Sequence, residues 1–128
     1  PTVSLVLGGS HSIGVPLAVA AKKSFIVPSA TMTLHPVRIN GLVIGVPQSF
    51  DYFEKMQWRI IDFITRNSSA DGDELKRMIM KTDQMTTDIG TVLGGAEAVE
   101  KGLIDQVGSL GEAISSLKDM ISHQKSLQ

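Results

Sequence analysis

A serine and a histidine stand at the ends of two predicted strands, where they could act together as a nucleophile and its general base. Ser12 lies in the glycine-rich stretch GGSHSIGVP, residues 8–16, between an apolar run and a predicted helix. At such a turn the first backbone N–H groups of the helix have no carbonyl within the helix to which they can donate a hydrogen bond. These free donors can stabilise an oxyanion. The glycines allow a strained turn and a close approach of substrate. Ser12 is therefore a candidate nucleophile, although the simpler interpretation is that Ser10 or Ser12 only caps the helix.

His35 is the candidate general base. It ends the predicted strand at residues 31–34, and the C-terminal ends of parallel strands gather at one edge of a sheet. Ser12 and His35 at that edge would form a nucleophile and its base. A partly buried histidine hydrogen-bonded to the backbone is the simpler interpretation. His11 adjoins Ser12, but neighbours on a tight turn point apart, so His11 is a poor base candidate.

Three aspartates could orient the histidine: Asp83, Asp88 and Asp105. Asp105 lies at the edge of a predicted strand, after an alanine-rich helix. Asp88 lies in a threonine-rich loop from which a carboxylate could turn back toward the sheet edge. No spacing rule selects among them.

Composition excludes several classes of protein. The 128 residues suit one domain, and 42% hydrophobic content is enough for a core. The net charge of −1 gives no argument for binding nucleic acid. Cysteine is absent and the three histidines are scattered, so neither a disulfide nor a metal site is expected. No uninterrupted apolar run approaches the roughly 18 residues of a membrane span, so no transmembrane helix is expected. The expected location is the cytoplasm.

The elements that must position these residues follow from hydrophobic periodicity. Apolar runs predict strands at residues 2–7, 24–27, 31–34 and 103–107. Apolar residues spaced by three or four predict helices at residues 13–23, 50–66, 73–82, 96–101 and 110–123. Strand, helix, strand in this order predicts a parallel βαβ unit. Asn40-Gly41 predicts a tight hairpin between residues 37–39 and 42–44. The chain starts in a predicted strand, so we expect it to be the C-terminal part of a longer polypeptide.

Four segments, in order, resemble the Clp protease proteolytic subunit family, and within it the translocation-enhancing branch of spore-forming bacteria. They are PTVS at residues 1–4, GSHSIG at 9–14, TLHP at 33–36 and AEAVEKGLID at 96–105. The resemblance implies an α/β fold, the crotonase-like ββα superhelix (ClpP-like). It also implies a serine endopeptidase that forms homo-oligomeric rings, cleaves unfolded or extended peptide and uses no cofactor. Whether an ATP-dependent unfoldase is a partner stays an open question.

The resemblance also implies roles for individual residues. Ser12 falls on the family's nucleophile, His35 on its general base, and Ile13 on a residue whose backbone N–H helps form the oxyanion hole. Residues 37–66 fall on the region that binds extended peptide and meets the opposite ring. An extended peptide can add to an exposed hairpin edge as a strand. The substrate-binding residues expected there are Ile39, Leu42, Val43 and Ile44.

Three departures from the family pattern affect these expectations. Gly90 stands where the family has its acid, so we predict that Asp88, two residues earlier, takes this role. The family's other oxyanion donor and first strands lie upstream of Pro1. Residues 1–128 are therefore expected to be one ClpP-like domain without its N-terminal strands and helix, inactive alone. The predicted hairpin replaces a glycine- and glutamine-rich segment, so substrate selection is expected to differ.

Other functions stay open. A crotonase-like acyl-CoA enzyme would share the fold, but its chemistry does not require a Ser–His pair. A non-catalytic scaffold would have lost its acid, as Gly90 allows. A Ser–Lys peptidase would need a lysine from outside this segment.

Overall fold

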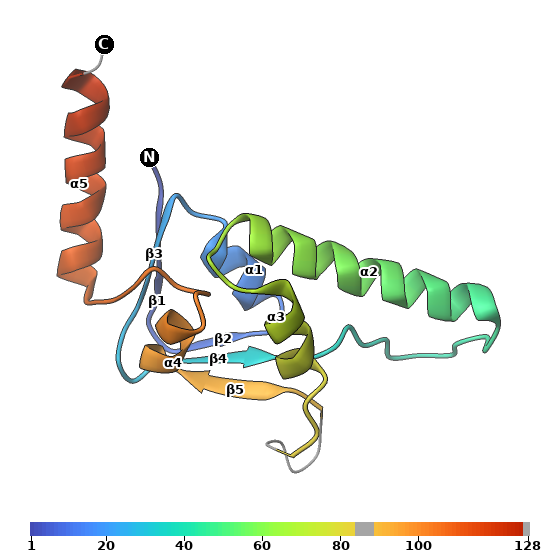
Figure 1. Cartoon of the computed structure of the whole chain (residues 1–128). Helices are drawn as coiled ribbons and strands as arrows, with labels where there is room; N and C mark the ends of the chain where they lie inside the picture. The colour runs from blue at the N-terminus through green and yellow to red at the C-terminus, as the bar shows by residue number, and fades with distance from the viewer. Residues whose placement is uncertain (84–88, 127–128) are drawn as a thin grey trace.

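Two three-stranded sheets form the centre of the molecule (Figure 1). The computed structural model describes residues 1–83 and 89–126. In the first sheet β1 (Val3–Val6), β3 (Lys23–Ile26) and β6 (Gln106–Val107) lie side by side and parallel. In the second, β4 (Thr31–Leu34) lies between a parallel β2 (Gly9–His11) and an antiparallel β5 (Thr91–Gly94). The helices are α1 (Gly14–Val19), α2 (Pro47–Arg66), α3 (Gly72–Ile79), α4 (Gly95–Glu100) and α5 (Leu110–Ser126).

The chain winds as repeated ββα units. It passes from β1 into β2 and then α1, so the first turn places one strand in each sheet. The second turn repeats this arrangement with β3, β4 and α2. The parallel pairing of β1 with β3 across α1 confirms the predicted βαβ unit. The architecture is the ββα superhelix that the sequence led us to expect.

The core lies where the sheets meet α1, α2 and α3. The strands β3 and β4 are covered on both faces, since three of four residues in each are buried. Burial on both faces is typical of strands in parallel pairs, although only two of the four residues in each of these strands are apolar. The bulkiest fully buried side chains come from several elements: Phe25, Ile26, Met32, Ile64, Leu75, Leu103 and Ile104. Residues far apart in sequence therefore fix the middle strand of each sheet.

Two short strands were not predicted. The strand β2 lies inside the stretch interpreted as a glycine turn, and its sequence GSH carries no apolar residue. The strand β5 lies in a segment with no predicted strand. Both depend on β4, because β4 is their only neighbour in the described second sheet.

The predicted hairpin at residues 37–39 and 42–44 is wrong. A type I′ turn needs positive φ at both central residues, and of the pair only Gly41 has it, at 135°. An isolated two-stranded hairpin is also marginal in water. In the structure residues 37–46, which we call the arm, run without strand pairing away from the sheets and beside α2 (Figure 1). The helix α2 then begins at Pro47, earlier than predicted.

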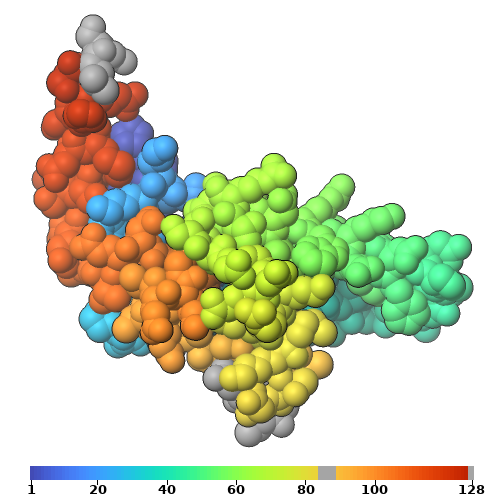
Figure 2. All heavy atoms as spheres, viewed as in Figure 1, coloured from blue at the N-terminus to red at the C-terminus, as the bar shows by residue number. Residues whose placement is uncertain are grey.

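The arm and α2 project from one side of the molecule, and α5 from another (Figure 2). The arm carries exposed apolar side chains, with Leu42 fully accessible and Ile44 74% exposed. In the part of the chain that the structure describes, no helix is both long enough and apolar enough to cross a membrane.

Asp105 and Ser24 tie β3 to the segment before β6. One carboxylate oxygen of Asp105 accepts hydrogen bonds from the Ser24 N–H at 2.7 Å and from the Ser24 hydroxyl at 2.9 Å. The Asp105 N–H donates back to the Ser24 hydroxyl oxygen at 3.0 Å. Ser24 is only 3% exposed, so water has little access to replace these partners.

We expect Asp105→Ala to lower the free energy of unfolding by about 2 kcal/mol, because the buried N–H and hydroxyl of Ser24 lose a charged acceptor. Urea unfolding followed by circular dichroism, at matched protein concentration, measures the change. Asp119→Ala on the exposed side of α5 is the control, with an expected change within about 0.5 kcal/mol. Equal midpoints for the two variants would contradict the structural role of Asp105.

Candidate active site

Ser12 occupies a strained position between β2 and α1. Its φ of 54° is positive, which holds for no other non-glycine residue among those described. The left-handed conformation costs about 1–2 kcal/mol for such a residue, and strain of this kind clusters at functional sites. The backbone holds it in place: the Ser12 N–H donates to the Thr33 carbonyl at 3.0 Å, and the Ser12 carbonyl accepts from the Val15 N–H at 3.1 Å.

The hydroxyl of Ser12 does not cap the helix. Ile13 is the N-cap residue of α1, and no side chain makes the cap hydrogen bond. The simpler interpretation of Ser12 as a cap is therefore wrong. Ser10 is only 6% exposed and packs beneath Gly14, so it is inaccessible to a substrate, whereas Ser12 is exposed.

His11 turns away from Ser12. Its imidazole folds back over Gly9, and its Nδ1 lies 2.5 Å from the hydroxyl of Thr33, the residue opposite it on β4. His11 does not line the pocket that Ser12 faces. The arrangement agrees with the expectation that His11 is a poor base candidate.

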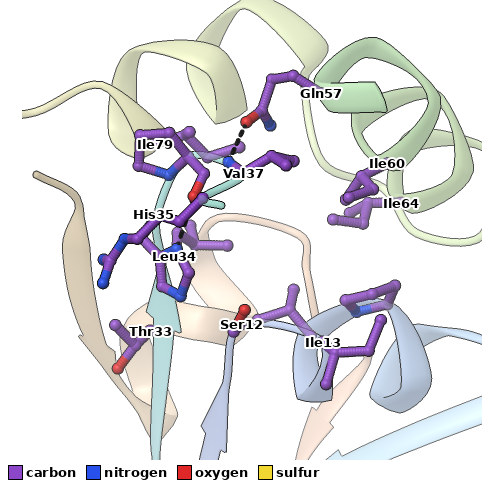
Figure 3. Close-up of a pocket in the computed structure, with 14 residues that line it drawn as sticks. Ser12, Ile13, Thr33, Leu34, His35, Val37, Gln57, Ile60, Ile64 and Ile79 are labelled. Atoms are coloured by element: carbon purple, nitrogen blue, oxygen red, sulfur yellow. Dashed lines mark hydrogen bonds between the residues drawn. The ribbon is translucent and has the colours of Figure 1, made fainter. Parts of the chain in front are cut away.

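Ser12 and His35 face the same pocket, of about 290 Å³ (Figure 3). They enter it from the ends of neighbouring strands, and both side chains point into the pocket. Apolar side chains form much of the wall: Ile13, Val15, Leu34, Val37, Ile60, Ile64 and Ile79. The remaining lining residues are Pro16, Thr33, Pro36, Arg38 and Gln57. The pocket therefore combines a hydroxyl and an imidazole with walls suited to an apolar side chain.

His35 is half-buried and bonded to its own backbone segment. Its Nδ1 lies 2.8 Å from the carbonyl oxygen of Pro36. A carbonyl has no proton to give, so Nδ1 carries the hydrogen and donates it. In the neutral ring Nε2 then holds a lone pair, which is the state that a general base requires. The hydrogen bond to the backbone is the one that the simpler interpretation of His35 expected. It is also compatible with His35 acting as a general base.

Gly90 lies directly beside His35. The antiparallel register pairs Leu34 with Thr91, so the next position along brings Gly90 to His35. Its φ is +142°, and a Cβ atom added there would overlap the Leu34 carbonyl and lie 3.1 Å from Cβ of His35. A residue with a side chain does not fit this backbone. Asp88, the predicted acid, lies outside the described residues and stays a prediction.

The other two aspartate candidates are engaged elsewhere. Asp105 is bonded to Ser24, and Asp83 is exposed, with a carboxylate oxygen 3.6 Å from the Lys81 ammonium. Among the described residues no carboxylate lines the pocket. The described residues also include no group of three or more histidine, aspartate or glutamate side chains that could hold a metal ion.

The predicted peptide-binding residues lie on the arm, outside the pocket. They are exposed, and the fractions are 49% for Ile39, 101% for Leu42, 43% for Val43 and 74% for Ile44. Only the start of the arm, Val37 and Arg38, lines the pocket. The role of the four exposed arm residues as substrate contacts stays a prediction. The role of the Ile13 N–H in the oxyanion hole also stays a prediction.

Gln57 is a pocket residue that the sequence analysis did not identify. Its side-chain oxygen accepts a hydrogen bond from the Val37 N–H at 2.8 Å. A signal was available, because Gln57 follows Phe53 by four residues and precedes Ile60 by three. A polar residue therefore lies on the apolar face of a predicted amphipathic helix, where it needs a specific partner.

Comparison with known proteins identifies the family. A Clp protease family model matches residues 1–110. The translocation-enhancing protein TepA of Halalkalibacterium halodurans is 53% identical over 125 residues, which cover 98% of this chain and 49% of that protein. The chain thus spans about half the length of this curated relative. These matches, together with the ββα superhelix and the four resembling segments, show that the chain belongs to the Clp protease family.

Proposed function

We propose that this chain carries the catalytic pair of a Clp-type serine endopeptidase, which acts in the full-length, assembled protein. The observation that carries the proposal is the shared pocket, which is lined both by an exposed serine in a strained turn and by a histidine whose Nδ1 is the donor. Family membership supports it, since Ser12 and His35 fall on the family's nucleophile and base. The strained turn resembles the sharp strand-to-helix turn that exposes a nucleophile in other serine hydrolases.

The proposed reaction is acyl transfer to Ser12. Nε2 of His35 takes the hydroxyl proton as Oγ of Ser12 attacks the carbonyl carbon of the peptide bond. The Ile13 N–H, which as the N-cap amide has no partner within the helix, donates to the oxyanion. The imidazolium then returns the proton to the leaving amine, and water hydrolyses the acyl-ester by the reverse sequence. The second oxyanion donor comes from elsewhere in the full-length protein.

The proposed substrate is an extended peptide segment. The apolar walls of the pocket accommodate one apolar side chain of the peptide, and the arm offers an extended backbone to which a peptide can add. Ile39, Leu42, Val43 and Ile44 supply the apolar contacts. A homo-oligomeric ring in the cytoplasm, with an unfoldase partner, is the corresponding proposal for the whole protein.

A non-catalytic scaffold is the second candidate. The observation that favours it is Gly90, which occupies the family's acid position and whose backbone admits no side chain. A scaffold would keep the fold and the assembly but would not turn over peptide. The following experiment distinguishes the two candidates.

Ser12→Ala is expected to reduce peptide hydrolysis by roughly 10⁶-fold, to background, because the nucleophile is removed. Assembly is expected to remain unchanged, since the Ser12 side chain supports no cap. A fluorogenic peptide, a fluorophosphonate probe and size-exclusion chromatography measure hydrolysis, labelling and assembly of the full-length protein. Ser29→Ala, in an exposed turn, is the control. Wild-type protein that assembles but is neither labelled nor active would favour the scaffold.

Asp88→Asn tests the predicted acid. If Asp88 shares the Nδ1–H of His35 with the Pro36 carbonyl and so helps to orient the imidazole, kcat should fall by about 10⁴-fold, because the histidine loses its carboxylate partner. The measurement is kcat of the full-length protein on the same peptide. Wild-type turnover by the variant would remove Asp88 from the site.

Gly90→Asp restores the residue type that the family pattern places here, yet we expect it to inactivate the enzyme. A side chain at this φ is strained and would displace the Leu34 carbonyl and His35. The measurements are the melting temperature and kcat. Gly111→Asp lies in the exposed first turn of α5, where a Cβ would meet only the Ser109 hydroxyl oxygen at an ordinary contact distance of 3.8 Å, and it should change neither quantity. Increased turnover by Gly90→Asp would show that the backbone adapts.

A further inference from the structure

We infer that Gln57 is a positioning residue for His35. It holds the peptide unit between Pro36 and Val37 so that the Pro36 carbonyl fixes the imidazole. The inference rests on the proposed function, because it concerns the base of that site.

The first step is the bond between His35 and Pro36. The imidazole Nδ1–H donates to the Pro36 carbonyl oxygen at 2.8 Å. This bond selects the tautomer with the hydrogen on Nδ1 and sets the ring orientation, which is the task of an acid in a catalytic triad. The orientation of the imidazole is therefore only as well defined as the position of the Pro36 carbonyl that accepts its hydrogen bond.

The second step is the planarity of the peptide unit. The Pro36 carbonyl and the Val37 N–H belong to the same rigid plane and point in opposite directions. The Val37 N–H donates to the Gln57 side-chain oxygen at 2.8 Å. Restraining the N–H therefore restrains the carbonyl, and Gln57 acts on His35 through one peptide group (Figure 3).

The third step is the position of this peptide in the chain. The strand β4 ends at Leu34, and the arm beyond Val37 has no strand pairing in the structure, so the sheet does not hold the 36–37 peptide. The helix α2, by contrast, is anchored one and two turns later by buried Ile61 and Ile64. Gln57 thus connects a peptide outside the sheet to a helix that is fixed in the core.

Four variants of the full-length protein test this inference. Gln57→Met keeps the side-chain length but removes the acceptor, Gln57→Asn keeps the amide but shortens its reach, and Gln57→Glu retains an acceptor. Gln48→Met is the matched control, at an exposed position of the same helix. We expect Met and Asn at position 57 to lower kcat about tenfold with little change in KM, as the loss of one hydrogen bond predicts. Gln57→Glu should keep at least half of the wild-type kcat, and Gln48→Met all of it.

A second measurement reports on the imidazole without requiring activity. ¹⁵N NMR of protein labelled at histidine distinguishes the Nδ1–H from the Nε2–H tautomer, and a His35→Gln sample assigns the signal. We expect His35 to be mostly the Nδ1–H tautomer in the wild type and in Gln57→Glu. Gln57→Met and Gln57→Asn should show a mixture of the two tautomers. A merely structural role for Gln57 would lower stability in these variants without changing the tautomer.

The outcomes separate this inference from the proposed function. Active wild-type enzyme with unchanged kcat and tautomer in Gln57→Met and Gln57→Asn would overturn the role of Gln57 and leave the peptidase intact. Wild-type protein without labelling or hydrolysis would overturn the peptidase, and the NMR result would still decide how His35 is held. Loss of activity in Gln57→Glu as large as in Gln57→Met would also overturn the inference.

Discussion

The pairing of β2 with β4 is the constraint on which the site depends. The strand β2 has three residues, and its parallel ladder ends where the Ser12 N–H donates to the Thr33 carbonyl. The strand β4 also carries His35 directly after its last residue. One strand therefore sets the position of both proposed catalytic side chains, and any displacement of β4 would move them together.

The burial of β4 makes this constraint rigid. Met32, Thr33 and Leu34 are 0%, 6% and 3% exposed, so the strand cannot shift without opening the core on both faces. The strained turn at Ser12 is held from its other side by α1, where Val15 and Val19 are each 1% exposed. The stability of the core thus offsets the conformational cost at Ser12, as expected where a site relies on strain.

The sequence predicted the strands and helices that are determined by the pattern of their own residues. Apolar runs identified β1, β3 and β4, and the spacing of apolar residues identified α2 and α5, so His35 could be placed at the end of its strand. Ser12 could be placed only in the turn after β1, because the strand that it follows, β2, was not predicted. The strands β2 and β5 could not be recognised, because short strands of small or mixed residues gain their order from β4 rather than from their own composition. The hairpin prediction failed for the related reason that Asn40-Gly41 permits a turn but supplies no surface against which strands can pack. Gln57 was overlooked because its partner is a backbone N–H twenty residues away.

The arm and the proposed base share one anchor. Val37 is the first residue of the arm, and its N–H donates a hydrogen bond to the side-chain oxygen of Gln57. The same peptide unit presents the Pro36 carbonyl to His35. The direction in which the arm leaves the sheet and the orientation of the imidazole are consequently set by a single peptide plane. A contact on the arm that rotates this plane or breaks its bond to α2 would reach Nδ1 of His35 through the Pro36 carbonyl.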